Sequence, residues 1–406
     1  MKYLILVGDG MADHPIPELG GRTPLQAAAT PAMDRLCKKS SVLELATVPA
    51  GFHPGSDVAN MSLLGYDPAQ YYTGRAPLEA ASMAISLDPD QTAFRCNLVT
   101  LDRRDRRTTM VDFSAGHIST REAAELIAAI QAECGGERFQ FHSGISYRHL
   151  LVVRDPIPDM TVVPPHDYIG KDVTAAFQAY LDLPDWGPLV LKAEEILANH
   201  PLNRKRLERG ERPATSIWPW GCGKMPAMPT LMQRFNISGT MISAVDLLKG
   251  LGVCAGLRIA EVEGATGYID TNYEGKARAA IEALQDQDFV FVHLEAPDEA
   301  GHQGRLDHKI KAIEDFDCKI VDRIISTLEG FAEPFRVVVT MDHYTPLSIR
   351  THTAEPVPAL LYDSRTTMPN AASSFDERLL NSGNGYARIA GYNLINHLLA
   401  KEDLYD

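Results

Sequence analysis

The sequence holds few cysteines and no long hydrophobic run. Its six cysteines are scattered over 406 residues without a CxxC pair, which excludes zinc-finger ligation. Such cysteines are typical of reduced thiols, so we expect a cytoplasmic location. The apolar start MKYLILVGDG is too short for the hydrophobic region of a signal peptide, and no later stretch approaches the roughly 20 apolar residues of a membrane span. We therefore expect neither export nor a membrane partner.

Positive charge is also scarce. Lys and Arg number 39 against 53 Asp and Glu, which gives a formal net charge of −14. This balance argues against nucleic acid as a partner, because nucleic-acid binding needs an excess of basic residues. A small anionic substrate requires only a few local cations and stays compatible with it. Composition gives no prediction of the oligomeric state.

What the sequence does contain is an alternation of apolar runs and helical patterns. Short runs at residues 3–7, 289–292 and 337–339 read as buried strands, and each is followed closely by an acid, namely Asp9, Asp298 or Asp342. Residues 307–328 carry isoleucines at helical spacing. Alternating strands and helices predict an α/β fold with a mostly parallel sheet flanked by helices, in which ligands bind beyond the carboxyl ends of the strands.

The middle of the chain has a different character. Strand-like segments FRCNLVTL and ISYRHLLVVR accompany a helix whose start, STRE at residues 119–122, fits a capping box. A chain of 406 residues also exceeds the usual size of one hydrophobic core. We predict a core domain of residues 1–86 and 225–406, with a smaller α+β domain of residues 87–224 inserted into it.

Acids and histidines recur near the predicted strand ends. APDEAGHQG places Asp298 and His302 four residues apart, MDHYTP supplies Asp342 and His343, and RTHTAEPVP adds His352. The same Asp-His dipeptide at 13–14 and 307–308 follows no buried-strand pattern, so we interpret both as surface pairs.

A serine in GFHPGSDVAN allows two interpretations. Ser56 stands just before a predicted helix, where a serine usually caps the helix. A helix N-terminus is equally a place where a phosphorylated serine is favoured. With Asp9 and the acids and histidines above, Ser56 would complete an oxygen and nitrogen ligand set, which suits Mn²⁺ or Zn²⁺ more than Ca²⁺. Two such ions form the usual clamp for phosphoryl transfer, and a serine coordinated to one becomes a nucleophile.

These motifs also carry a family resemblance. The order of DG, GSDVANMSLLGYDP, GRAPLEAAS, DEAGHQG and DHYTPLSIRTHTAEPVP, with AGHIST, SYRHLLV and IWPWGCGK in the middle region, resembles the archaeal-type cofactor-independent phosphoglycerate mutases of the alkaline phosphatase superfamily. The resemblance spans essentially the whole chain. It implies an alkaline-phosphatase-like core, and an isomerase that interconverts 3-phosphoglycerate and 2-phosphoglycerate through a phosphoserine at Ser56, without 2,3-bisphosphoglycerate.

The resemblance further implies the roles of individual residues. One divalent ion would be held by Asp298, His302 and His352, and a second by Asp9, Ser56, Asp342 and His343, with Mn²⁺ expected and Zn²⁺, Co²⁺ or Mg²⁺ as alternatives. Substrate would be gripped by His117, Arg148, His149 and Lys224, and Arg75 would reach its phosphate from the core side. The inserted domain would exclude water as a lid.

Two other functions stay open at this point. The THTAEPVP-like ending also resembles proteins proposed to be homoserine kinases, which would make the chain an ATP-dependent phosphotransferase. A P-loop is absent, because GCGKM does not fit GxxxxGK followed by Ser or Thr. A non-catalytic metal-binding protein is the third reading, and it would retain Mn²⁺ without turning over any phosphate ester.

Overall fold

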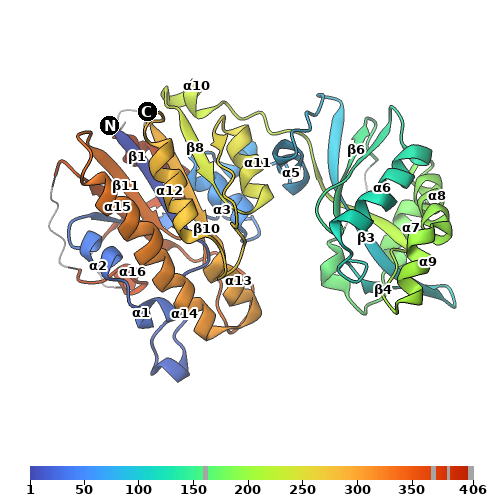
Figure 1. Ribbon diagram of the computed structural model, residues 1–406, viewed down its shortest axis with the longest axis horizontal. Coiled ribbons are helices and arrows are strands. Elements are labelled where there is room, and N and C mark those ends of the chain that lie inside the picture. Colours follow the sequence, from blue (N-terminus) through green and yellow to red (C-terminus); the bar gives the residue numbers. More distant parts are fainter. Residues whose placement is uncertain (159–162, 367–371, 382–384, 401–406) are drawn as a thin grey trace. The chain divides into compact units, whose positions relative to one another are not determined.

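The computed structural model describes residues 1–158, 163–366, 372–381 and 385–400. The chain forms two compact units (Figure 1). Unit 1 combines Met1–Tyr72 with Ala227–Asp406, and unit 2 is Thr73–Pro226. In the described ranges, no helix is both long and apolar enough to cross a membrane.

Unit 1 is built on an eight-stranded sheet with the order β13-β2-β12-β11-β1-β10-β8-β9. Only β12 runs antiparallel to its neighbours, and the other pairings are parallel. The predicted mostly parallel sheet is therefore confirmed. The strands are β1 (Lys2–Gly8), β2 (Ser41–Ala46), β8 (Gly239–Ile242), β9 (Arg258–Ile259), β10 (Phe289–Leu294), β11 (Phe335–Thr340), β12 (Val357–Asp363) and β13 (Ala387–Ala390).

The three predicted strands are adjacent at the centre of this sheet, in the order β11-β1-β10. Their apolar runs are buried on both faces, as expected for strands of a parallel sheet covered by helices. Helices α12, α14 and α15 lie in front of these strands in Figure 1. The predicted helix at 307–328 is confirmed as α14, a π-helical segment (Phe316–Val321) and α15. The helices of unit 1 are α1 (Pro24–Ala27), α2 (Pro31–Cys37), α3 (Ser56–Leu63), α4 (Pro68–Tyr71), α10 (Leu231–Phe235), α11 (Asp246–Cys254), α12 (Tyr273–Ala283), α13 (Ala296–Gln303), α14 (Leu306–Asp315), α15 (Asp322–Leu328), α16 (Arg378–Asn381) and α17 (Leu394–Leu399).

Unit 2 has an antiparallel sheet of five strands, in which β7 also pairs with β3. Side chains of β3 alternate between the faces, so that Phe94 joins a large apolar cluster with Leu126 and Val190 of the helices, whereas Ala93 lies in a second, smaller cluster. The elements are α5 (Arg75–Ser82), β3 (Gln91–Arg104), β4 (Arg107–Asp112), α6 (Thr120–Cys134), β5 (Phe139–His142), β6 (Arg148–Arg154), α7 (Thr174–Leu181), α8 (Trp186–Asn199), α9 (Pro201–Glu208) and β7 (Ser216–Gly223).

The first boundary of unit 2 differs from the predicted one. Helix α5 was expected in the core domain, but Ala76 and Ala80 of this helix pack against Ala93 and Leu150 of the unit 2 sheet. The division therefore falls after Tyr72 and not after residue 86. At the other end, the division after Pro226 lies two residues beyond the predicted one. The helix was misplaced because nothing local in its sequence shows which sheet it covers.

Candidate active site

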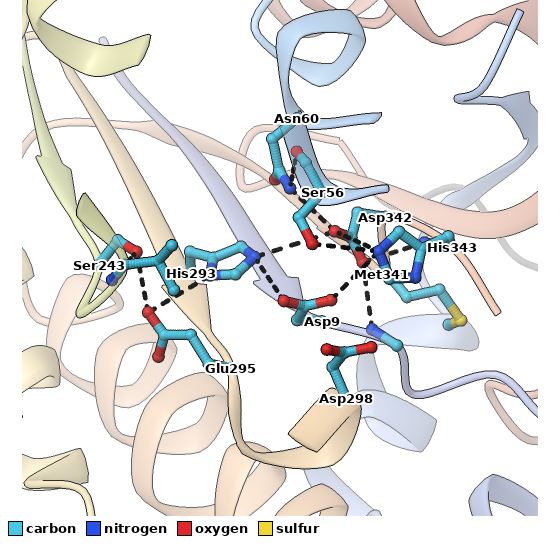
Figure 2. A network of polar contacts seen from close by, with 12 residues as sticks. Asp9, Ser56, Asn60, Ser243, His293, Glu295, Asp298, Met341, Asp342 and His343 are labelled. Carbon is cyan, nitrogen blue, oxygen red and sulfur yellow. Dashed lines mark hydrogen bonds and ion pairs between the residues drawn. The ribbon is translucent and has the colours of Figure 1, made fainter. Parts of the chain in front are cut away.

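The candidate site lies at the carboxyl ends of the three central strands of unit 1 (Figure 2). Asp9 follows β1 directly, and Asp342 with His343 follows β11 after one intervening residue. Helix α13 begins just beyond β10 and carries Asp298 in its first turn and His302 in its last. Because neighbouring parallel strands end at one edge of a sheet, residues far apart in the sequence meet here.

Ser56 does not cap its helix. It is the first residue of α3, with Gly55 at the cap position, and its side chain makes no capping hydrogen bond in the described structure. The Ser56 Oγ instead lies 3.2 Å from His343 Nε2 (Figure 2). Asn60, one turn along the helix, donates to the Ser56 carbonyl at 2.8 Å and to Asp342 Oδ2 at 2.9 Å. The capping interpretation is therefore wrong, and the hydroxyl belongs to the acid and histidine cluster.

The three candidate histidine ligands present the same ring nitrogen to this cluster. His302 Nδ1 lies 3.0 Å from the Arg350 carbonyl oxygen, and His352 Nδ1 lies 3.3 Å from that of Pro54. A carbonyl oxygen only accepts, so each Nδ1 carries a hydrogen and donates, and Nε2 is the nitrogen that faces the cluster. His343 likewise directs Nδ1 to Thr345 Oγ1 at 3.3 Å. Contacts of this kind at the second ring nitrogen orient histidines that bind metals.

The structure brings all seven predicted metal ligands together in two groups. In the first, His302 Nε2 lies 2.9 Å from His352 Nε2 and 3.2 Å from Asp298 Oδ2. In the second, His343 Nε2 lies 3.5 Å from Asp9 Oδ1 and 3.3 Å from Asp342 Oδ2, besides its contact with Ser56. The rings of His343 and His352 connect the groups, with centroids 4.1 Å apart. Asp298, His343 and His352 also lie close enough to share one ion.

The electrostatics of these groups favour a bound cation. Burial and the charges of Asp342 and Asp298 raise the pKa of the Asp9 carboxyl well above its usual value. Burial would also raise the pKa of Asp298, but hydrogen bonds with His302 and His352 hold it well below the usual value. Burial would lower the pKa of His302, and the same carboxylate raises it to about 9. Buried carboxylates at such short range repel one another, and divalent ions would relieve that repulsion.

A glycine allows the strand ends to approach. Gly10 has φ +59°, and a Cβ atom there would lie 2.4 Å from Thr345 Oγ1 and 2.8 Å from Asp298 Oδ1. Its N–H donates to Asp342 Oδ1 at 3.1 Å. The position therefore requires glycine both for its backbone conformation and for space.

The sequence analysis missed the histidine next to Asp9. His293 is the fifth residue of β10 and is completely buried, with Nε2 at 3.2 Å from Asp9 Oδ2 (Figure 2). Glu295 and the buried Lys276 lie behind it. The available signal was the polar pair His293 and Glu295 inside the apolar run FVFVHLEAP. The predicted strand ended at residue 292 and so did not include it.

The prediction that Asp13 and His14 form a surface pair is wrong for Asp13. Asp13 is buried and pairs at 2.8 Å with Lys309, whose side chain is also completely buried. The lysine further donates to the carbonyl oxygens of Ala12 and Thr345, and so joins the loop after β1 to the loop after β11. Asp307 of the other pair is largely exposed, as expected.

Two of the predicted substrate residues stand on an aromatic and basic surface of unit 2. The ring of His117 lies 6.3 Å from that of Tyr147, and the guanidinium of Arg148 lies 5.8 Å from the same ring. Both residues are exposed. Arg95, which the sequence analysis did not select, stacks on Trp220 at 4.3 Å and pairs with Glu79 at 3.1 Å. Burial lowers the pKa of Arg95, Glu79 opposes that shift, and the charges of Arg75 and Arg148 lower the pKa further.

Of the other three predicted substrate residues, two are placed differently from the expectation, and Lys224 stays a prediction. His149 is buried, its Nδ1 accepts the Gly144 N–H at 3.0 Å, and burial lowers its pKa to about 3, so it cannot serve as an exposed cation. Lys224 donates to the Pro89 carbonyl and pairs with Asp155 at 3.0 Å. Arg75 opens α5 and so belongs to unit 2, not to the core side.

Comparison with known proteins adds a family. A sequence model of the 2,3-bisphosphoglycerate-independent phosphoglycerate mutases matches residues 38–203. A probable 2,3-bisphosphoglycerate-independent phosphoglycerate mutase of Geobacter sulfurreducens is 50% identical over 399 residues, which cover 98% of this chain and all of the relative. The chain belongs to this family. The mutase of Methanosarcina barkeri is 51% identical over 384 residues, 94% of this chain and 96% of its own.

Solved structures agree with this membership of the phosphoglycerate mutase family. A structure from Pyrococcus horikoshii matches with a TM-score of 0.81 and 28% identity, covering 100% of this chain and 99% of its own. The cofactor-independent phosphoglycerate mutase of Thermoplasma acidophilum matches with a TM-score of 0.66 and 29% identity, covering 99% of this chain and 100% of its own. The similarity therefore extends over both units.

Proposed function

We propose that this protein interconverts 3-phosphoglycerate and 2-phosphoglycerate through a phosphoserine at Ser56, without 2,3-bisphosphoglycerate. Family membership supports the substrate, because the relatives are named for it. The observation that carries the mechanism is the position of Ser56 Oγ, which faces His343 among the clustered acids and makes no cap. All the relatives described above with a named activity are mutases, which gives the kinase-like alternative no support.

We further propose that the cluster holds two divalent cations. Asp298, His302 and His352 would bind one, and Asp9, Ser56, Asp342 and His343 would bind the other. Their mixed nitrogen and oxygen donors suit Mn²⁺, with Zn²⁺, Co²⁺ and Mg²⁺ as alternatives. Bound ions of this kind neutralise phosphoryl oxygens and lower the pKa of a coordinated hydroxyl. Among the described residues the buried Asp9 Oδ1 has no hydrogen-bond partner, and His343 Nε2 lies 3.5 Å from it. This supports the assignment, because a buried carboxylate oxygen needs a partner.

The chain's own residues would then carry the transfer. Ser56 Oγ would form a bond to phosphorus as the bond from phosphorus to the glycerate oxygen breaks, and the proton of the serine hydroxyl would end on the freed glycerate oxygen. The retained glycerate turns, its other hydroxyl attacks the phosphoserine, and Ser56 is restored. Asn60 fixes the position of Asp342 relative to Ser56, because it donates hydrogen bonds to both residues. The start of α3 favours the negative charge that the phosphoserine brings.

The glycerate would be held by unit 2. Arg75, Arg95 and Arg148 offer guanidinium groups that match carboxylate and phosphate geometry, and His117, whose ring contacts Tyr147 as Arg148 does, adds a donor. Lys224 stays a candidate only if it leaves its pairing with Asp155. His149 is not included in this proposal, because its imidazole is buried and neutral.

A crossover experiment tests the proposed function. Metal-loaded protein is given a mixture of unlabelled 3-phosphoglycerate and 3-phosphoglycerate carrying both ¹³C in the glycerate and ¹⁸O in the phosphoryl group, with neither bisphosphoglycerate nor ATP. NMR and mass spectrometry should find 2-phosphoglycerate in which the two labels stay together, because the glycerate is retained. No 2-phosphoglycerate would refute mutase activity, and scrambled labels would refute a retained glycerate. Release of inorganic phosphate alone would indicate a phosphatase.

A further inference from the structure

A chain of buried polar side chains leads away from Asp9 into the interior of unit 1 (Figure 2). His293 comes first, with Nε2 at 3.2 Å from Asp9 Oδ2 and 3.9 Å from Asp342 Oδ2. Its other ring nitrogen, Nδ1, lies 3.4 Å from Glu295 Oε1. Within the described residues neither nitrogen has a well-aligned hydrogen bond, although both lie at ion-pair distance from carboxylate oxygens.

Glu295 is fixed from several sides. Its Oε1 accepts hydrogen bonds from Ser243 Oγ at 2.8 Å and from the Ala244 N–H at 2.6 Å. Its Oε2 pairs with Lys276, which also donates to the His293 carbonyl oxygen at 3.0 Å. All four side chains of this network, Ser243, Lys276, His293 and Glu295, are buried. A buried network is costly unless each member has a defined place, so such a network specifies one arrangement.

The two oxygens of Asp9 face two different imidazoles, and one of these, His293, is not a candidate ligand. Oδ1 faces His343 at 3.5 Å, on the side of the candidate ions, and Oδ2 faces His293 at 3.2 Å, on the side of the interior. A carboxylate held at one oxygen can rotate little about its bonds, so its other oxygen points in a fixed direction. Contacts that orient a ligand from behind raise the affinity of a site for its ion.

We propose that His293 is a positioning residue, which holds Asp9 so that Oδ1 is directed at the ion, and that Glu295 and Lys276 keep the imidazole in place. This inference rests on the proposed metal site. It assigns His293 no contact with substrate and no place among the ligands. Its effect should therefore appear in ion binding before any turnover is measured.

Two variants of similar polarity test the two ring nitrogens of His293 separately. His293→Gln places an amide N–H near the position of Nε2 and keeps a donor for Asp9. His293→Asn places its amide near Nδ1, where it reaches Glu295 and falls short of Asp9. His308→Phe is the control, because this half-buried histidine of unit 1 contacts Tyr268, Arg305 and Asp307 and, among the described residues, no candidate ligand. Circular dichroism and thermal unfolding would first establish that all three proteins are folded.

Mn²⁺ binding is then measured on metal-free proteins from the electron paramagnetic resonance signal of free Mn²⁺, without substrate. We expect His293→Asn to lower the affinity for one of the two Mn²⁺ ions about 10- to 100-fold, while both ions still bind at saturating Mn²⁺. His293→Gln and His308→Phe should stay within a few-fold of wild type. Unchanged affinity in the Asn variant would overturn the proposal, as would equal weakening in a folded Gln variant. Complete loss of one ion would make His293 a direct ligand and overturn it too. Because no substrate is present, failure of the mutase assay would leave this result unaffected.

Discussion

Replacing Ser56 with alanine separates chemistry from stability. The Oγ atom has one recorded hydrogen-bond partner, His343 Nε2 at 3.2 Å, and caps nothing in the described structure. The change should therefore cost less than the roughly 1 kcal/mol of a lost helix cap. Asp9, Asp342 and His343 remain as ligands, so the ion of that group should stay bound more weakly. Turnover should nevertheless fall on the order of 10⁴-fold or more, as when other covalent enzymes lose their nucleophile.

A serine on the same helix provides the control. Ser62 is buried, and its Oγ has no hydrogen-bond partner among the described residues. Removing an unsatisfied hydroxyl should be neutral or stabilise the fold by up to about 1 kcal/mol, with turnover unchanged. Urea unfolding gives the free energies, and ³¹P NMR follows the appearance of 2-phosphoglycerate. Acid quench of the wild type, followed by peptide mass spectrometry, should locate phosphate on Ser56. Near wild-type turnover in Ser56→Ala, or its loss in Ser62→Ala, would refute the assignment.

Three further predictions concern the ions and the fold. Chelation should abolish turnover and Mn²⁺ should restore it, since both proposed sites need their ions; full activity in protein shown by elemental analysis to be metal-free would contradict this. Gly10→Ala should lower stability by about 1–3 kcal/mol and weaken Mn²⁺ binding, because its Cβ would meet Thr345 and Asp298; unchanged melting temperature and affinity would show that the loop adapts. Burial raises the pKa of Glu377 to about 7 from 4.5. The free energy of unfolding of the wild type should therefore decline by at most about 3 kcal/mol as the pH rises from 4.5 through 7. Urea unfolding at pH 5 and pH 9 measures this decline, and it should be smaller in Glu377→Gln.

The sequence was most informative where a local pattern and a general rule agree. Buried parallel strands are short and continuously apolar, and the residues after them lie at the ligand-binding edge. These two facts alone bring Asp9, Asp298 and Asp342 to one place, where the structure has them. The spacing of Asp298 and His302 is one helical turn, and the structure places both on α13.

The sequence was least informative about partners that come from distant elements. Helix α5 has an ordinary amphipathic pattern, and only its contact with Ala93 and Leu150 shows that it covers the unit 2 sheet. Asp13 looks like a surface residue because Lys309, which neutralises it, lies nearly 300 residues away. His149 follows an exposed arginine in a strand, and only the alternation of that strand turns it inward. The errors at α5 and Asp13 concern tertiary pairing, the error at His149 concerns which face of a strand the residue occupies, and none concerns the type of element.

The buried acids of unit 1 differ in how their charge is balanced, and the difference supports the location of the ions. Glu295 and Asp13 pair with buried lysines, Lys276 and Lys309, which stay in place as permanent partners. Asp9, Asp298 and Asp342 pair with histidines. A lysine ammonium cannot coordinate a metal ion beside the carboxylate, because it offers hydrogen-bond donors and no lone pair. A histidine can give up its proton and bind the ion beside the carboxylate through the same nitrogen. The fold thus neutralises its structural acids internally, and we expect a metal to balance the charge of the acids that surround Ser56.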